Sequence, residues 1–201
     1  MLLGLVGGLL VAAPPEQVLA HRSSAAAADG LPIPSLSHSQ LAVVADYREA
    51  ILQVAARQSR PDGSLIRLRN FVDIQYMTCL WGMIPKSLTD EASPFNECSH
   101  AYLSGAMALL LHLRDREGGS GEAGKLLNRV AMAMLADETA PMLCAYSGEP
   151  FNTADVIAPH WRDVPFHLPS LLFLCGALLL PAAAAGCLWK GMARTSGDPT
   201  G

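Results

Sequence analysis

Cysteines carry the clearest chemical signal in this chain of 201 residues. Cys79, Cys98 and Cys144 precede a long apolar segment, and thiols on the exported side of a membrane can be oxidised. Cys79 falls near the end of one predicted helix and Cys98 near the start of the next, so an antiparallel hairpin brings them to similar heights. We therefore predict a Cys79–Cys98 disulfide, with Cys98–Cys144 as the alternative pairing. Either pairing leaves one thiol, to be buried or to join a partner.

Metal and cofactor motifs are missing from the sequence. Cys98 and His100 are two residues apart, a spacing that points side chains to different sides of a helix. His160 and His167 lie seven residues apart in a proline-containing segment. None of the C-x-x-C, H-E-x-x-H or C-x-x-C-H spacings occurs. Core packing is the ordinary explanation for the methionines. The sequence therefore predicts no metal site and no cofactor.

The sequence contains no complete catalytic motif either. Residues 119–125 match the G-x-x-x-x-G-K spacing of a phosphate-binding loop, but Leu126 stands where that loop needs a hydroxyl for magnesium. The G-x-S-x-G spacing of many hydrolases is absent. His112 lies on an apolar run, where a core histidine is a simpler interpretation than a general base. We therefore expect a structural or binding role rather than an enzyme.

The N-terminus predicts export. Residues 2–13 form an apolar run, shorter than the ~20 residues that a helix needs to cross a bilayer. A proline-broken stretch then leads to Val18, Leu19 and Ala20, which suit signal peptidase. We predict a signal peptide over residues 1–20, cleaved after Ala20. An uncleaved interfacial helix is the alternative, because no Lys or Arg precedes the run.

The C-terminus predicts a membrane anchor. Residues 168–189 are 22 residues without a charge, and Trp189 stands where an interfacial aromatic residue would. Lys190 and Arg194 follow, so the positive-inside rule places the tail, residues 190–201, in the cytoplasm. Residues 21–167 then face outside the cytoplasm, in the periplasm or the extracellular space. The alternative is a buried helix of a soluble protein.

The predicted exported part is helical, so helices must position any functional site in it. After a flexible linker over residues 21–36, apolar periodicity predicts four of them, over about 38–58, 65–84, 94–116 and 121–137. Ser37 and Gln40 form a capping box at the first helix. The third helix is apolar almost all round and is expected at the centre. Short loops favour an all-α, up-down bundle over residues 37–167, followed by one transmembrane helix at residues 168–189.

An interface is predicted just before the anchor. Aromatic residues and Arg are the types that dominate protein–protein contacts, and residues 145–167 are rich in them. The candidates are Tyr146, Phe151, Trp161, Arg162 and Phe166. A segment next to the membrane suits docking onto another membrane protein. A loop folded back over the bundle is the alternative.

Composition narrows the functional classes. Charged residues make up 16% of the chain against a usual ~25%, and the formal net charge is −4, which disfavours a nucleic-acid-binding module. We expect a single-pass, membrane-anchored exported protein that acts as a structural or accessory subunit of an envelope membrane complex, with other membrane or envelope proteins as partners. The alternatives are a membrane-tethered binding module for a small ligand or metal ion, and an enzyme with an unfamiliar site.

Overall fold

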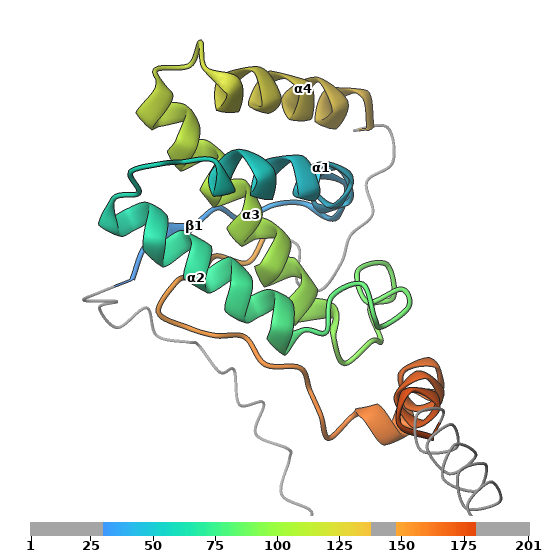
Figure 1. Ribbon diagram of the computed structural model, residues 1–201. Coiled ribbons are helices and arrows are strands. Elements are labelled where there is room, and N and C mark those ends of the chain that lie inside the picture. Colours follow the sequence, from blue (N-terminus) through green and yellow to red (C-terminus); the bar gives the residue numbers. More distant parts are fainter. Residues whose placement is uncertain (1–29, 138–147, 180–201) are drawn as a thin grey trace, which may run out of the picture.

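The computed structural model describes residues 30–137 and 148–179 (Figure 1). These residues are mostly helical, as the sequence predicts. The predicted signal peptide (1–20), most of the linker (21–36), the tail (190–201) and the second part of the predicted anchor (180–189) lie outside them. The elements are β1 (Pro32–Ile33), α1 (His38–Ala56), α2 (Gly63–Thr78), α3 (Asn96–Glu117), α4 (Glu122–Asp137), β2 (Phe151–Asn152), a 3-10 turn (Val164–Phe166) and a helix over residues 168–179.

The helix at residues 168–179, which we call the terminal helix, covers the first part of the predicted anchor. Across residues 30–137 and 148–179, no helix is both long enough and apolar enough to cross a membrane.

Polar caps explain where α1 and α2 begin. The Gln40 N–H donates to the Ser37 hydroxyl and the Ser37 N–H donates to the Gln40 side chain, so the predicted capping box is present. Asp62 caps α2 by accepting from the Leu65 N–H at 2.8 Å. That hydrogen bond lowers the pKa of Asp62; His112 and Arg116 add to the effect and desolvation opposes it.

The end of α2 differs from the prediction, because the helix stops at Thr78 rather than near residue 84. Leu80 and Gly82 have φ angles of 50° and 79°, in the left-handed region that a right-handed helix cannot contain. The apolar periodicity continues past the last helical turn, so it did not reveal this boundary. Residues 80–85 form a turn instead of a helix.

The short sheet was not predicted either. β1 and β2 pair antiparallel, with Pro32 opposite Asn152 and Ile33 opposite Phe151. Two residues per strand are too few to show an alternating pattern. The pairing nonetheless holds the segment before α1 against the segment that follows α4.

Packing centres on α3, which contacts α1, α2 and α4. Leu103, Leu109 and Leu113 on this helix are completely buried. Gly105 allows α2 to approach closely, because a Cβ at this position would lie 2.8 Å from the Phe71 ring. The continuous apolar run of this segment therefore reflects its central place in the bundle.

A second, smaller core attaches the terminal helix to the domain. Ile84, Phe95 and Val164 form it, and Phe173 and Leu174 pack against it from the terminal helix. The terminal helix therefore lies beside the end of the bundle where α2 ends and α3 begins (Figure 1).

The predicted Cys79–Cys98 disulfide is present. Its Cα atoms are 5.5 Å apart, within the range for disulfides, and both residues are fully buried. It joins the C-terminal end of α2 to the first turn of α3. Cys175 is an exposed free thiol on the terminal helix, and Cys144, the alternative partner, lies outside the described residues.

Removing the disulfide should lower stability without changing the fold. We expect Cys79→Ala/Cys98→Ala to reduce the free energy of unfolding by roughly 3 kcal/mol, because the crosslink limits the unfolded chain. Urea denaturation of the full chain in mild detergent measures this. Cys175→Ser is the control and should leave the midpoint unchanged. An unchanged midpoint for the double variant would contradict the prediction.

The Tyr102 hydroxyl gives a pH-dependent prediction. Tyr102 is fully buried against Trp81 and Tyr76, and its hydroxyl has no hydrogen-bond partner in the described part of the chain. Burial raises its pKa to about 12 from 10.0. The folded state therefore favours the neutral phenol, and this preference contributes to the stability of the fold. The contribution is complete below pH 10 and is lost as the pH rises toward 12.

We expect Tyr102→Phe to be as stable as the unchanged protein at pH 7, because it removes an unpaired buried hydroxyl. Between pH 10 and pH 12 the variant should lose less stability than the unchanged protein. Thermal unfolding followed by circular dichroism at several pH values measures both. Parallel losses in the two proteins would rule out the Tyr102 contribution.

Candidate functional site

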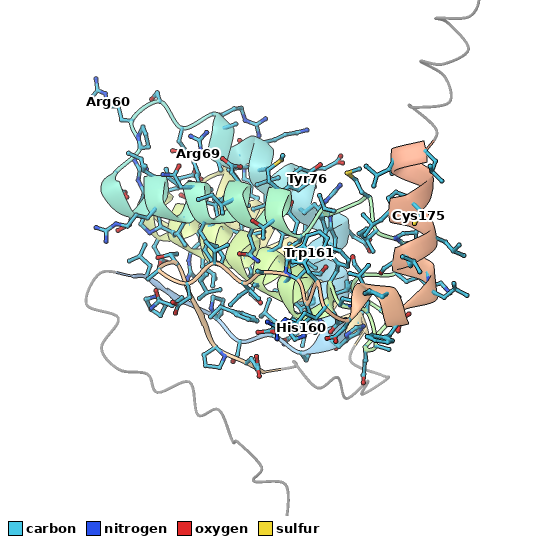
Figure 2. The ribbon with its side chains drawn as sticks, turned by 90° about the horizontal axis from the view of Figure 1, so that it is seen from below. Arg60, Arg69, Tyr76, His160, Trp161 and Cys175 are labelled. Carbon is cyan, nitrogen blue, oxygen red and sulfur yellow. A yellow bond between two sulfur atoms is a disulfide. The ribbon has the colours of Figure 1, made fainter. Side chains whose placement is uncertain are left out.

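Residues 153–167, which we call the connector, join β2 to the terminal helix and contain most of the predicted interface residues. In Figures 1 and 2 the connector crosses the face formed by α2 and α3 and ends at the terminal helix. Its backbone is largely irregular, so its position depends on contacts with the helices beneath it.

Gln75 makes the central contact with the connector. Its side-chain amide donates to the Ile157 carbonyl at 2.6 Å, and its side-chain carbonyl accepts from the Ile157 N–H at 3.1 Å. The same amide nitrogen lies 3.3 Å from the sulfur of Cys79. Gln75 is fully buried, so this paired hydrogen bond satisfies a backbone that water cannot reach.

The next anchor holds the connector to the start of α3. The His160 N–H donates to the Pro94 carbonyl at 2.9 Å, and His160 Nε2 lies 3.0 Å from the Glu97 carboxylate. The indole of Trp161 packs edge-on against Phe95, with ring centroids 5.4 Å apart. Figure 2 shows His160 and Trp161 on this part of the connector.

Asp90, His167 and Ser170 form a hydrogen-bonded chain at the end of the connector. His167 Nδ1 lies 2.7 Å from the Ser170 hydroxyl, and His167 Nε2 lies 3.1 Å from the Asp90 carboxylate. These are the residue types of a nucleophile, base and acid triad. Ser170, however, is completely buried, so its hydroxyl cannot meet a substrate.

The chain is better explained as a helix cap. The Ser170 N–H also points to His167 Nδ1, at 3.4 Å, which is how a capping side chain satisfies the first turn of a helix. Asp90 then ties the capped helix to the loop before α3. The sequence did not reveal this arrangement, because Asp90 lies 77 residues from His167 and no local spacing relates them.

The predicted interface residues separate into two groups. Phe151 is 7% exposed and belongs to the main core, where it pairs with Ile33 in the sheet. Trp161 is 52% exposed, Phe166 is 88% exposed, and Arg162 is also exposed. Tyr146 lies outside the described residues. The connector therefore brings Trp161, Arg162 and Phe166 to the surface close to the terminal helix.

The terminal helix has an exposed apolar face. Phe173 and Leu174 pack against the domain, whereas Leu168, Leu172, Leu178 and Leu179 are each more than 60% exposed. Figure 2 shows Cys175 on this helix at the side of the molecule. A helix of a soluble monomer seldom leaves so many large apolar side chains in water.

An open hollow lies between α1 and the turn after α2. Its volume is about 300 Å³, and its lining includes Asp46, Arg48, Trp81 and Lys86. This hollow offers one aromatic, one acidic and two cationic side chains. In the described ranges, no group of three His, Cys, Asp or Glu side chains could hold a metal ion.

No family model, curated protein or solved structure matches this chain. The function must therefore be inferred from the residues themselves. Two features of the surface bear on it: the anchored connector with its exposed Trp161, Arg162 and Phe166, and the apolar face of the terminal helix.

Replacing Gln75 should loosen the connector. We expect Gln75→Leu to lower the free energy of unfolding by roughly 2 kcal/mol, because the buried N–H and C=O of Ile157 lose their partners. Hydrogen exchange of connector amides should become faster, while the amides of α3 stay protected. Gln53→Leu, at an exposed position of α1, is the control. Unchanged exchange at Ile157 in Gln75→Leu would contradict the anchoring role.

Proposed function

We propose that this protein is a single-pass membrane protein whose exported helical domain acts as a structural or accessory subunit of an envelope membrane complex. The observation that carries the proposal is the exposed apolar face of the terminal helix. Burying Leu168, Leu172 and Leu178 in lipid removes a large apolar area from water, at roughly 25 cal/mol per Å².

The sequence beyond the terminal helix supports the same anchor. The uncharged run extends from residue 168 to residue 189, which is ~33 Å as a helix and matches a hydrocarbon core of ~30 Å. Trp189 and Lys190 then supply the aromatic and basic residues of a cytoplasmic boundary.

The disulfide supports placement of the domain outside the cytoplasm. Cytosolic proteins of mesophiles rarely keep structural disulfides, whereas periplasmic and secreted proteins commonly do. The Cys79–Cys98 bond is fully buried and crosslinks two helices of the core, which is a structural rather than a catalytic position.

The accessory role is inferred from the connector. Trp161 and Arg162 are exposed residues of the types that anchor interfaces, and they are held in place by the contacts of His160 and Gln75. A rigid surface beside the membrane can bind another membrane protein without first paying an ordering entropy.

A membrane-tethered binding module is the second candidate. The hollow beside Trp81 favours it, because Trp81 lines it together with two cationic side chains, Arg48 and Lys86, and one carboxylate, Asp46, a mixture that suits a small polar ligand. Titration of small charged molecules with Trp fluorescence as the readout distinguishes this candidate from the first.

Extraction and capture test the proposal together. We expect the full chain to stay with native membranes in alkaline carbonate, and to retain a stoichiometric membrane partner after gentle solubilisation. Trp161→Ala/Arg162→Ala should reduce the amount of captured partner by on the order of tenfold or more, the loss expected for an interface hot spot. Arg60→Ala, exposed on the loop before α2, is the control. Release by carbonate would refute the anchor, and partner loss equal to that of the control would refute the interface.

A further inference from the structure

The turn after α2 is unusually apolar for a surface loop. Residues 80–85 read Leu-Trp-Gly-Met-Ile-Pro and contain no charge, and Lys86 follows directly. Met83 in this turn is 52% exposed. Leu80, Gly82 and Lys86 have positive φ angles, which give the turn its shape. The backbone of Leu80 and Lys86 is strained, because residues other than glycine rarely adopt such angles.

This turn packs directly against the terminal helix. Ile84 is part of the small core that receives Phe173 and Leu174, and Leu80 packs on the same core. The contact is therefore made by the helix residues that lie one to two turns beyond Leu168.

The length of the apolar run fixes how deep this contact lies. A helix of 22 residues spans ~33 Å, and a bilayer core is ~30 Å thick, so the run has almost no residues to spare. Its first residue must then stand at the membrane boundary. Phe173 and Leu174 lie five and six residues further on, which is ~8–9 Å along the helix. The small core that receives them also contains Val164, four residues before Leu168, so Ile84 and Leu80 on the same core lie close to the membrane boundary.

We infer that the turn at residues 80–85 is seated in the lipid interface beside the terminal helix, so that the exported domain rests on the bilayer rather than standing away from it. The inference rests on the proposed anchor. Met83 then lies among acyl chains and headgroups, and the neighbouring Lys86 reaches the lipid phosphates.

Phe166 extends the same contact. It is 88% exposed and lies two residues before Leu168, at the point where the connector meets the terminal helix. An aromatic ring at this level suits the headgroup region. The lipid surface is thus reached from two parts of the chain far apart in sequence, Met83 and Phe166.

A fluorescent label at position 83 tests the inference in the full chain. In a Cys144→Ser/Cys175→Ser/Cys187→Ser background, Met83→Cys and Met132→Cys each receive an environment-sensitive dye. Met132 is the matched control, because it is a 67% exposed methionine on α4. Figure 1 shows α4 on the side of the domain away from the terminal helix. Both proteins are reconstituted into phosphatidylcholine–phosphatidylglycerol vesicles, with and without lipids that carry a nitroxide quencher on the acyl chain.

We expect the label at position 83 to emit at shorter wavelength and to lose most of its fluorescence to the nitroxide lipid, while the label at position 132 keeps its emission and intensity. Carbonate extraction of the same vesicles reports the anchor independently. An unquenched, water-like label at position 83 in protein that resists carbonate would overturn the inference and leave the proposed anchor standing. An unquenched but blue-shifted label would overturn it in favour of a second copy of the chain covering the turn. Release of the protein by carbonate would overturn the anchor and the inference together.

Discussion

The junction of Cys79, Cys98 and Gln75 determines how the parts of this protein are arranged. The disulfide fixes the end of α2 against the start of α3, and Gln75, one helical turn before Cys79, holds the backbone of Ile157 in a water-free site. The side chain of Gln75 has its two backbone partners at Ile157 only while the connector is in place. The bundle core and the connector therefore share this buried point of attachment. The terminal helix is held by the connector and also by its own packing against Ile84 and Phe95.

The same junction explains why the connector needs little regular structure of its own. The connector is held by its backbone at Ile157 and His160, through Gln75 and Pro94, and by the side chains of His160 and His167, through Glu97 and Asp90. Each anchor lies on α2, on the first turn of α3 or in the loop just before it. Trp161, Arg162 and Phe166 are thus presented from a segment whose position is set by polar contacts rather than by a helix or sheet.

Sequence patterns of a few residues predicted those features of the fold that depend on residues close together in the chain. The capping box at Ser37, the helical segments and the hairpin that pairs Cys79 with Cys98 all follow from spacings of a few residues or from one turn between neighbouring helices. The Gln75–Ile157 pair spans 82 residues, and a buried glutamine gives no sign of its partner in the sequence. The end of α2 was missed because left-handed φ angles at Leu80 and Gly82 interrupt a helix that the apolar periodicity alone would continue.

The order of the anchors along the connector also describes how mechanical load would pass through the protein. Tension on the terminal helix first meets its packing against Ile84 and Phe95 and the His167–Asp90 pair, then the His160 contacts, and then the two hydrogen bonds of Gln75. These are non-covalent and lie in series, so they would yield one after another. The crosslink behind them joins the two helices covalently, so the connector would peel away while α2 and α3 stay together.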